Sequence, residues 1–362
     1  MLSGPVLRGG LLALLAAALF GISTPLVQSF GAGLGPLTTA ALLYAGAALV
    51  GALLRQPVQA EAALVRADGP RLLAMAFFGA VVGPVALAWG LQRTSGTSAS
   101  LMLSLEAFFT ALLAWRLYHE TMDRRVWSAM ALLLAGGVAL IVDRGTLGAL
   151  EVAGLLAVLL ATAAWGVDNS LSRPLADKDP GQVVLYKAAL GAACTGALAW
   201  LASEPLPTAT AALALLAIGA TGYGLSLRFY LLAQRTFGAG RTGSVFSFAP
   251  FIGAAVAIAL GERSVGMLTL LGGVLMVAGV VLHLAESHGH SHQHNALEHE
   301  HAHTHDDGHH GHSHGHDQSH DHNTGETSPS QPAPGSHSHW HRHEPQQHTH
   351  AHAPDAHHQH RH

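Results

Sequence analysis

Four charged side chains stand inside otherwise apolar segments of this sequence. They are Glu106, Asp168, Lys187 and Arg228, and Asn169 follows the aspartate directly. A charged group at the centre of a bilayer costs about 2.5–3.5 kcal/mol on insertion scales, so such a residue usually faces a partner or a water-filled cavity. These residues could therefore neutralise one another, bind a polar solute, or take up and release a proton.

Three of these charges fall at a similar depth. Because a helix rises about 1.5 Å per residue, Asp168, Lys187 and Arg228 reach nearly one level when their helices stand side by side. An ion pair between Asp168 and Lys187 would neutralise both residues, and it is compatible with a structural or a functional role. Arg228 lies just over one turn from a helix end, where its long side chain is expected to extend to the interface.

Glu106 has no obvious partner in the sequence and lies near the middle of its segment. Burial disfavours the charged form of a lone carboxyl group. A carboxyl group that readily takes up a proton is what a proton-coupled carrier needs. The alternative is a neutral, hydrogen-bonded packing residue.

Aromatic side chains are weaker candidates for contact with a solute. Trp165, Tyr44 and Tyr186 could stack on one, as could Tyr223 and Tyr230. Aromatic residues are also enriched at the two membrane–water interfaces, and this is the default interpretation. We keep Trp165, Tyr44 and Tyr186 as candidate site residues.

The apolar segments predict a body embedded in a membrane. The chain is 49% hydrophobic and 11% charged. A bilayer core about 30 Å thick needs about 20 residues of helix, and irregular backbone in lipid would leave amide groups unsatisfied. We therefore expect an all-α integral membrane protein with ten transmembrane helices. The expected spans are residues 9–29, 35–54, 71–91, 97–117, 126–142, 150–172, 181–202, 209–233, 241–260 and 265–285.

The membrane body contains an internal sequence repeat. A shift of 142 residues places Gln92–Thr94 on Gln234–Thr236 and Glu120 on Glu262, with seven identities in 29 ungapped positions. Five spans per repeat would make the two copies enter the membrane in opposite directions, as in secondary transporters whose binding site lies between inverted repeats. The repeats are expected at residues 8–142 and 149–285.

Positive charge in the short loops predicts the orientation. With the N terminus inside, eleven Lys and Arg residues fall in cytoplasmic loops and three fall outside, as the positive-inside rule requires. Ten spans would then return the C terminus to the cytoplasm as well.

Several motifs resemble the EamA-type permeases of the drug/metabolite transporter superfamily. The matching stretches are Leu105–Trp115 with His119-Glu120, Phe248–Ala254 with Gly261-Glu262, and Trp165–Asn169 followed by Lys187. The resemblance covers residues 9–285. It implies ten helices in two repeats and transport of small metabolites across a cell inner membrane.

Two positions depart from the family pattern. Ala107 stands where the family usually has proline after Leu-Glu, and Pro250 is one step late relative to the repeat register. We therefore expect the helix breaks at these points to differ between the two repeats.

Residues 286–362 form a tail of a different composition. The tail contains 26 of the 28 histidines and hardly any aliphatic residue, so it is expected to be disordered. Neutral imidazoles two residues apart suit Zn, Ni or Co. The candidate metal ligands are His288, His290, His292, His294, His299, His301, His303, His305, His312, His314, His316, His337, His339, His341 and His343.

Two functions are compatible with this sequence. One is a metabolite carrier, in the export direction and driven by a proton or substrate gradient, with a tail that buffers or senses metal. The other is a carrier of a divalent metal ion or a metal chelate that the tail supplies. Lys187 and Arg228 would repel a cation, which favours the first. We expect no required cofactor, no enzymatic activity and no nucleic-acid partner; a homodimer remains open.

Overall fold

The computed structural model describes most of the chain, apart from short loop segments and much of the tail. The residues it describes are 4–55, 62–118, 122, 124–145, 148–175, 178–237, 239–262, 265–284, 289–293, 297–303, 337–343 and 347–351. Six of the predicted metal ligands lie outside these residues, namely His288, His294, His305, His312, His314 and His316.

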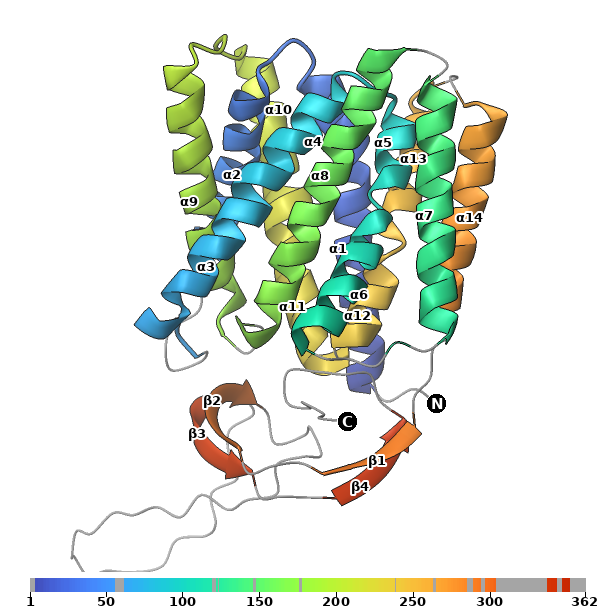
Figure 1. The fold of residues 1–362 in the computed structure, drawn as a ribbon. Helices are drawn as coiled ribbons and strands as arrows, with labels where there is room; N and C mark the ends of the chain where they lie inside the picture. The colour runs from blue at the N-terminus through green and yellow to red at the C-terminus, as the bar shows by residue number, and fades with distance from the viewer. Residues whose placement is uncertain are drawn as a thin grey trace, which may run out of the picture.

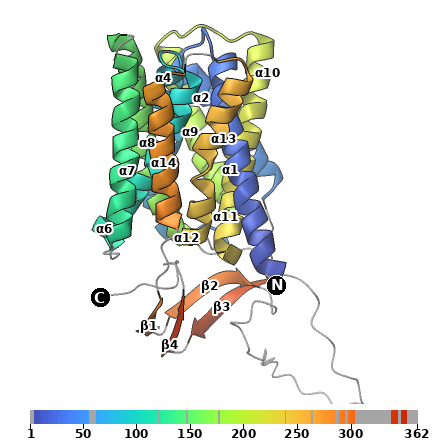
Figure 2. The ribbon, with the colours of Figure 1, turned by 90° about the vertical axis from the view of Figure 1, so that its right-hand side faces the viewer.

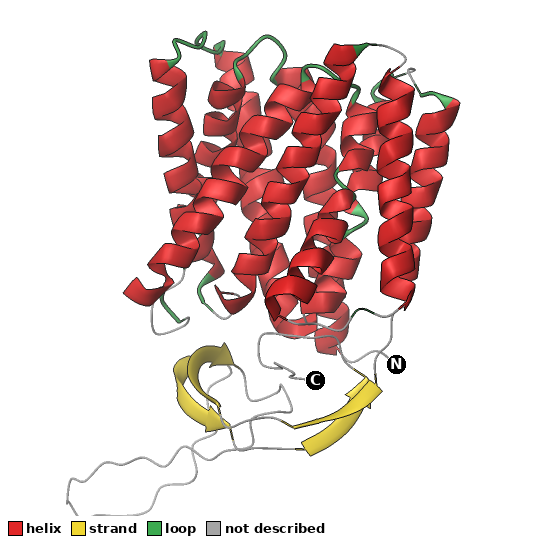
Figure 3. Ribbon diagram, in the orientation of Figure 1, coloured by secondary structure: helices red, strands yellow, loops and turns green. Residues whose placement is uncertain are grey.

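The body is a bundle of helices that run side by side (Figures 1 and 3). In the first repeat the helices are α1 (Gly4–Phe30), α2 (Pro36–Leu53), η1 (Arg66–Asp68), α3 (Gly69–Met75), η2 (Ala76–Val82), α4 (Gly83–Leu91), α5 (Gly96–Met102), α6 (Leu105–Tyr118) and α7 (Arg124–Gly145). In the second they are α8 (Ala149–Ser172), η3 (Arg173–Leu175), α9 (Pro180–Leu201), α10 (Ala209–Ile218), η4 (Gly219–Leu225), α11 (Ser226–Phe237), α12 (Ala239–Phe246), α13 (Ala249–Ala259) and α14 (Met267–Leu284).

The bundle has the dimensions and the surface of a membrane-spanning body. Nine helical segments in the described part of the chain are long and apolar enough to cross a bilayer, and Met267–His283 is a shorter apolar helix. Large apolar side chains are exposed on its outer surface, among them Leu206, Trp200 and Val274. An apolar exterior of this kind fits a lipid environment. Multi-pass membrane architecture is thus confirmed.

The two repeats interlock. Helix α1 of the first repeat contacts η4, α11 and α13 of the second, and α2 contacts η4 and α9. Conversely, helix α8 of the second repeat contacts η2, α4 and α6 of the first. Figure 2, turned by 90°, shows the pair α7 and α14 at one side of the bundle. Each repeat therefore buries its helices against the other, and the centre of the molecule is a repeat interface.

Glycines allow two of these cross-repeat contacts to be very close. A Cβ atom on Gly46 of α2 would lie 2.0 Å from the carbonyl oxygen of Leu216, at the end of α10. A Cβ atom on Gly191 of α9 would lie 2.5 Å from Cβ of Ala80 in η2. Small residues let membrane helices approach closely, which accounts for the glycine content of the apolar segments.

Both repeats break a helix in this region, and the second break lies two residues later in the register of the repeat. In the first repeat α5 ends at Met102 and α6 begins at Leu105; in the second α12 ends at Phe246 and α13 begins at Ala249. The first break contains no proline, and Pro250 lies in the first turn of α13, where its missing N–H group costs no helical hydrogen bond. The break therefore does not depend on proline.

Segments of the tail form short strands, which differs from the all-α, disordered prediction. The strands are β1 (Gly289–Gln293), β2 (Leu297–His303), β3 (His337–His343) and β4 (Gln347–Ala351). β1 pairs antiparallel with β4, and β2 pairs antiparallel with β3. The alternation of histidine with other residues has the period of a β-strand.

We call the end of the bundle at which α1 begins the N-side. The opposite end, which carries the loops at residues 31–35 and 92–95, is the far side; it is uppermost in Figure 1.

Candidate functional site

A small cavity lies inside the bundle where the two repeats meet. It has a volume of about 60 Å³, and six of the predicted site residues line it: Tyr44, Glu106, Trp165, Asp168, Asn169 and Lys187. Tyr44 and Glu106 come from α2 and α6 of the first repeat, and the other four come from α8 and α9 of the second. Residues far apart in the sequence therefore form one polar centre.

Asp168 and Lys187 form the ion pair that the sequence suggested. Lys187 Nζ donates a hydrogen bond to Asp168 Oδ2, and the two side chains are 4% and 5% exposed, respectively, so the pair is shielded from solvent. Asp168 Oδ1 is buried without a hydrogen-bond partner. This oxygen is an acceptor available to a bound solute or to water.

Glu106 does have a partner, which sequence reasoning missed. Asn169 Nδ2 on α8 donates a hydrogen bond to Glu106 Oε1 in the first turn of α6. Asn169 is the neighbour of Asp168, so two adjacent residues of α8 contact the other two ionisable groups of the cavity, Glu106 and Lys187. The carboxyl group of Glu106 thus belongs to a polar cluster and is not isolated.

A π-helical segment holds the aromatic residues of the cavity. Gly79 lies within η2, and its carbonyl oxygen accepts a hydrogen bond from Trp165 Nε1 at 3.0 Å and another from the Tyr44 hydroxyl group. A Cβ atom on Gly79 would lie 2.3 Å from Asp168 Oδ2. Only glycine leaves room for Asp168 here, and π-helical segments are frequent at functional sites.

The second repeat carries a matching π-helical segment, η4, on the other side of the cavity. Gly222 and Tyr223 of η4 line the cavity. A Cβ atom on Gly222 would lie 2.4 Å from Cβ of Ser23 on α1. Thus α1 packs on the π-helical segment of the second repeat, as α8 packs on that of the first.

Phe20 was not singled out from the sequence, although it organises the aromatic wall of the cavity. Its ring centroid lies 5.4 Å from that of Trp165, 5.8 Å from that of Tyr223 and 5.5 Å from that of Phe246. The signal was present, since Phe20-Gly21 in the first repeat matches Trp165-Gly166 in the second. Ser226, Tyr230 and Phe246 line the cavity as well and were not predicted as site residues.

Two predicted site residues lie elsewhere. Tyr186 is 43% exposed on the outer surface of α9, which fits the aromatic-belt interpretation. Arg228 does not line the cavity; its Nη1 atom donates to the carbonyl oxygen of Leu54, just beyond the end of α2, at 3.1 Å. Its side chain thus contacts the residue that follows the end of α2.

Side chains of the duplicated Gln-Arg-Thr motif donate hydrogen bonds to the loops that connect helices. Gln92 Nε2 donates to the carbonyl oxygen of Leu34 at 2.8 Å, and Arg235 Nη2 donates to that of Lys178 at 2.5 Å. Leu34 joins the first two helices of the first repeat, and Lys178 joins those of the second. The motif therefore fixes the corresponding connection at opposite ends of the bundle.

Within the described residues, no group of three or more His, Cys, Asp or Glu side chains is placed to hold a metal ion. The predicted ligands His290, His292, His299, His301, His303, His337, His339, His341 and His343 lie on the strands of the tail, of which the structure describes the backbone. Metal binding by the tail therefore remains a prediction.

Comparison with known proteins agrees with this architecture. The sequence model of the EamA-like transporter family matches residues 7–142 and again residues 152–285. The chain belongs to the EamA-like transporter family. It is 26% identical over 291 residues to an uncharacterized transporter of Methanothermobacter thermautotrophicus, across 74% of this chain and 83% of that protein.

A solved crystal structure of a protein shares the fold of this EamA-like transporter. The two superpose with a TM-score of 0.55 at 19% identity, over 77% of this chain and 95% of the other. The central cavity lies where the two matched repeats of the EamA-like transporter meet, with Glu106 from the first match and Asp168, Asn169 and Lys187 from the second.

Proposed function

We propose that this protein is a secondary transporter that exports small metabolites across the inner membrane and couples export to protons at Glu106. The observation that carries the proposal is the polar cluster of Glu106, Asn169, Asp168 and Lys187 in the cavity between the repeats. Ionisable residues inside a membrane are costly and usually mark a solute or ion pathway. In carriers built from inverted repeats, the binding site lies at the repeat interface near the midplane.

The volume of the cavity supports a carrier that changes shape. About 60 Å³ accommodates a few water molecules, whereas sites for small organic ligands usually enclose about 300–1,000 Å³. The cavity is therefore smaller than an organic cargo needs, and we propose that the repeats separate to admit the cargo. Interlocked helices such as α1 on η4 and α8 on η2 are the surfaces that would move.

Glu106 is the best candidate for the proton-coupling group. Its hydrogen bond from Asn169 is compatible with a charged or a protonated carboxyl group, because Oε1 can accept in either form. Asp168 is already paired with Lys187, so its charge is compensated. A proton on Glu106 and a cargo group that contacts the same carboxylate would then compete, which couples their movements.

We also propose the membrane orientation and the tenth span. The bias of eleven positive residues against three places the N-side in the cytoplasm. Helix α14, with 18 residues, is within the range of about 17–25 residues that can span a bilayer. The tail then lies in the cytoplasm, where its histidines would buffer or sense Zn, Ni or Co.

A divalent metal as cargo is the alternative function, favoured by the histidines of the tail. Lys187 lines the central cavity and would repel a cation, although Asp168 compensates part of its charge. The cavity offers two carboxylates, Glu106 and Asp168, and the described residues hold no larger ligand cluster. We therefore favour a metabolite as cargo.

Transport into sealed vesicles tests this proposal. Inverted vesicles loaded with the protein are offered a panel of radiolabelled metabolites and, in parallel, Zn, Ni and Co. Uptake of a metabolite that a proton gradient drives, and that Glu106→Gln removes, supports the proposal. Uptake of metal with no metabolite transported would replace it with the alternative.

A further inference from the structure

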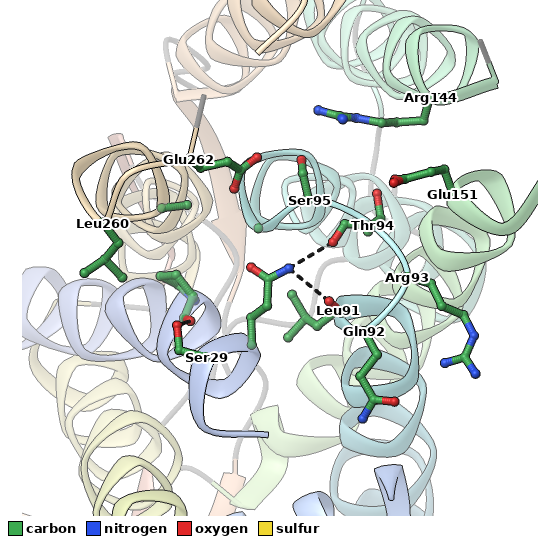
Figure 4. A pocket seen from close by; sticks show the side chains of 14 residues that line it. Ser29, Leu91, Gln92, Arg93, Thr94, Ser95, Arg144, Glu151, Leu260 and Glu262 are labelled. Atoms are coloured by element: carbon green, nitrogen blue, oxygen red, sulfur yellow. Dashed lines mark hydrogen bonds between the residues drawn. The ribbon is translucent and has the colours of Figure 1, made fainter. Parts of the chain in front are cut away.

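A second cavity, much larger than the central one, opens at the far side of the bundle (Figure 4). Its volume is about 500 Å³, and none of its lining residues lines the central cavity. Gln28, Thr94, Arg144, Glu151 and Glu262 bring polar groups to its wall from both repeats. We call it the far-side pocket.

The far-side pocket contains charged side chains, one of which has a buried oxygen without a hydrogen bond. Arg144 is 2% exposed, and its Nε atom donates to Ser98 Oγ at 2.9 Å. Glu262 Oε2 accepts a hydrogen bond from the backbone N–H group of Thr97 at 3.0 Å. Glu151 Oε2, in contrast, is buried without a hydrogen-bond partner. A buried carboxylate oxygen in this position calls for a bound donor, either water or a solute.

Four hydroxyl groups continue from this pocket into the protein without partners. The side-chain oxygens of Thr94, Thr97, Ser100 and Ser104 are all buried and accept or donate no hydrogen bond within the described residues. Several buried hydroxyl groups elsewhere in the bundle bond to a carbonyl of their own helix, for example Thr162 to Val158. Other hydroxyl groups that do so are those of Thr39, Ser170 and Thr195. We call the four unpaired groups the hydroxyl track.

Thr97 and Ser100 of the hydroxyl track lie in α5, whereas Thr94 precedes this helix and Ser104 follows its end. A step of three residues keeps Thr97 and Ser100 on the same side of α5. Thr94 lines the far-side pocket. Ser104 lies in the break between α5 and α6, two residues before Glu106. The track therefore runs from the pocket to the depth of the central site.

Ser100 of the track lies where α5 contacts α1 of the same repeat and α13 of the second repeat. A Cβ atom on Gly253 of α13 would lie 2.8 Å from Ser100 Oγ and 2.8 Å from the carbonyl oxygen of Gly21 on α1. The backbones of α1, α5 and α13 thus approach one another around Ser100, and they close the hydroxyl track there. Unpaired hydroxyl groups in a closed contact are unfavourable, which fits a contact that takes up water when it opens.

We propose that the hydroxyl track and the far-side pocket form the far-side half of the transport path, closed here at Ser100, and that they conduct polar, hydrogen-bonding solutes together with water. This inference rests on the proposed function, since it assigns a route to the cargo of the central cavity. Hydroxyl groups both donate and accept, and the pocket carries Arg144 beside Glu151 and Glu262. The path therefore suits a solute with donor and acceptor groups rather than a purely apolar one.

Cysteine labelling tests the path independently of transport. In a Cys194→Ser background, Thr94→Cys, Thr97→Cys, Ser100→Cys and Ser104→Cys are each exposed to a hydrophilic, membrane-impermeant thiol reagent from the far side. The reagent attacks only a thiolate that water reaches. Ala99→Cys is the matched control, because Ala99 lies on the same helix at 0% exposure but off the face of the track.

We expect labelling rates to fall in the order of depth, with Ser100→Cys at least about tenfold faster than Ala99→Cys, since only the former thiol meets water. Equal rates for Ala99→Cys and Ser100→Cys, with both proteins monodisperse, would overturn the path. If Ser100→Cys fails to insert, Thr97→Cys against Ala99→Cys makes the same comparison. Labelling of the track without transport of any metabolite would contradict the proposed function instead and leave the hydrated path standing.

Discussion

Asn169 Nδ2 on α8 donates a hydrogen bond to Glu106 Oε1 on α6, and this bond joins the two repeats at the central cavity. The residue before it, Asp168, holds Lys187 of α9. Adjacent side chains of α8 therefore connect a carboxyl group of the first repeat to an ion pair of the second. A change in the protonation of Glu106 can therefore alter the packing of both repeats, because these contacts connect them.

Glu106→Gln should leave the protein inserted but impair proton-driven transport. Glutamine keeps the volume and can accept the hydrogen bond from Asn169 through its amide oxygen, but it cannot release a proton. We expect the proton-driven rate to fall by about tenfold or more, because glutamine has no proton to exchange at this position. The measurement is uptake in vesicles across a range of pH. Normal transport with its pH dependence intact would make Glu106 a packing residue.

Removal of one partner of the buried ion pair should destabilise the protein more than removal of both. Lys187→Ala leaves Asp168 charged and buried, and breaking such a pair typically costs about 3–5 kcal/mol. We expect Lys187→Ala to impair transport as well, because Lys187 lines the cavity. Combined with Asp168→Asn, the loss of stability should be smaller. Thermal unfolding in detergent of the two single variants and the double variant measures the coupling; additive losses would contradict it.

Gly79→Ala should disturb the central site, whereas Gly69→Ala should not. The added methyl group at residue 79 would lie 2.3 Å from Asp168 Oδ2, while nothing lies within 4 Å at residue 69. Because the neighbour at residue 79 is a paired, buried carboxylate, we expect a loss of about 1–3 kcal/mol from overpacking. The thermal midpoint and the transport rate of the two variants provide the comparison. Equal midpoints would show that η2 can shift to admit the methyl group.

Much of this architecture follows from the sequence, because long apolar segments and an ungapped repeat are local signals. The side of each helix that is turned toward the cavity does not follow from the sequence. Tyr186 and Lys187 are neighbours, yet Lys187 enters the cavity and Tyr186 is exposed on the outer surface. Adjacent residues of a helix point about 100° apart. A membrane helix is apolar on every side. The pattern of hydrophobic residues therefore does not indicate which of the two residues faces the cavity.

The partner of Glu106 escaped prediction for a similar reason. Asn169 had been noted beside Asp168, but nothing in the sequence says that α6 lies against this part of α8. The same holds for Phe20 and Phe246, which meet across the repeat interface. Contacts between distant helices come from the packing of the whole bundle, and glycines such as Gly166 set them, since a Cβ atom there would lie 2.7 Å from Cβ of Phe109.

Reporter fusions should place the loops at residues 55–70, 117–125, 173–180 and 234–241 on the cytoplasmic side. The described residues that flank these loops lie at the N-side of the bundle, and the loops carry most of the positive charge. Accessibility of introduced cysteines from either side of the membrane provides an independent measurement. A tail on the outer side of the membrane would contradict both the orientation and the crossing of α14.

Removal of residues 287–362 should separate the metabolite carrier from the metal carrier. The tail follows α14, the last helix of the bundle, so the truncated protein should still insert and fold. If the cargo is a metabolite, truncation should leave its transport near normal in metal-free buffer. Added zinc or nickel should then change transport by the full-length protein alone, because the imidazoles bind the metal.

The sign of the pH dependence follows from the ligand chemistry. Imidazole binds metal in its neutral form and must lose its proton first, so the effect of zinc should be present above and fade below about pH 6.5, the ordinary pKa of histidine. The truncated protein serves as the control at each pH, since any direct effect of protons on the central cavity persists in it. If truncation instead abolishes metal flux in vesicles, the tail supplies the cargo, and the metal carrier replaces the metabolite exporter.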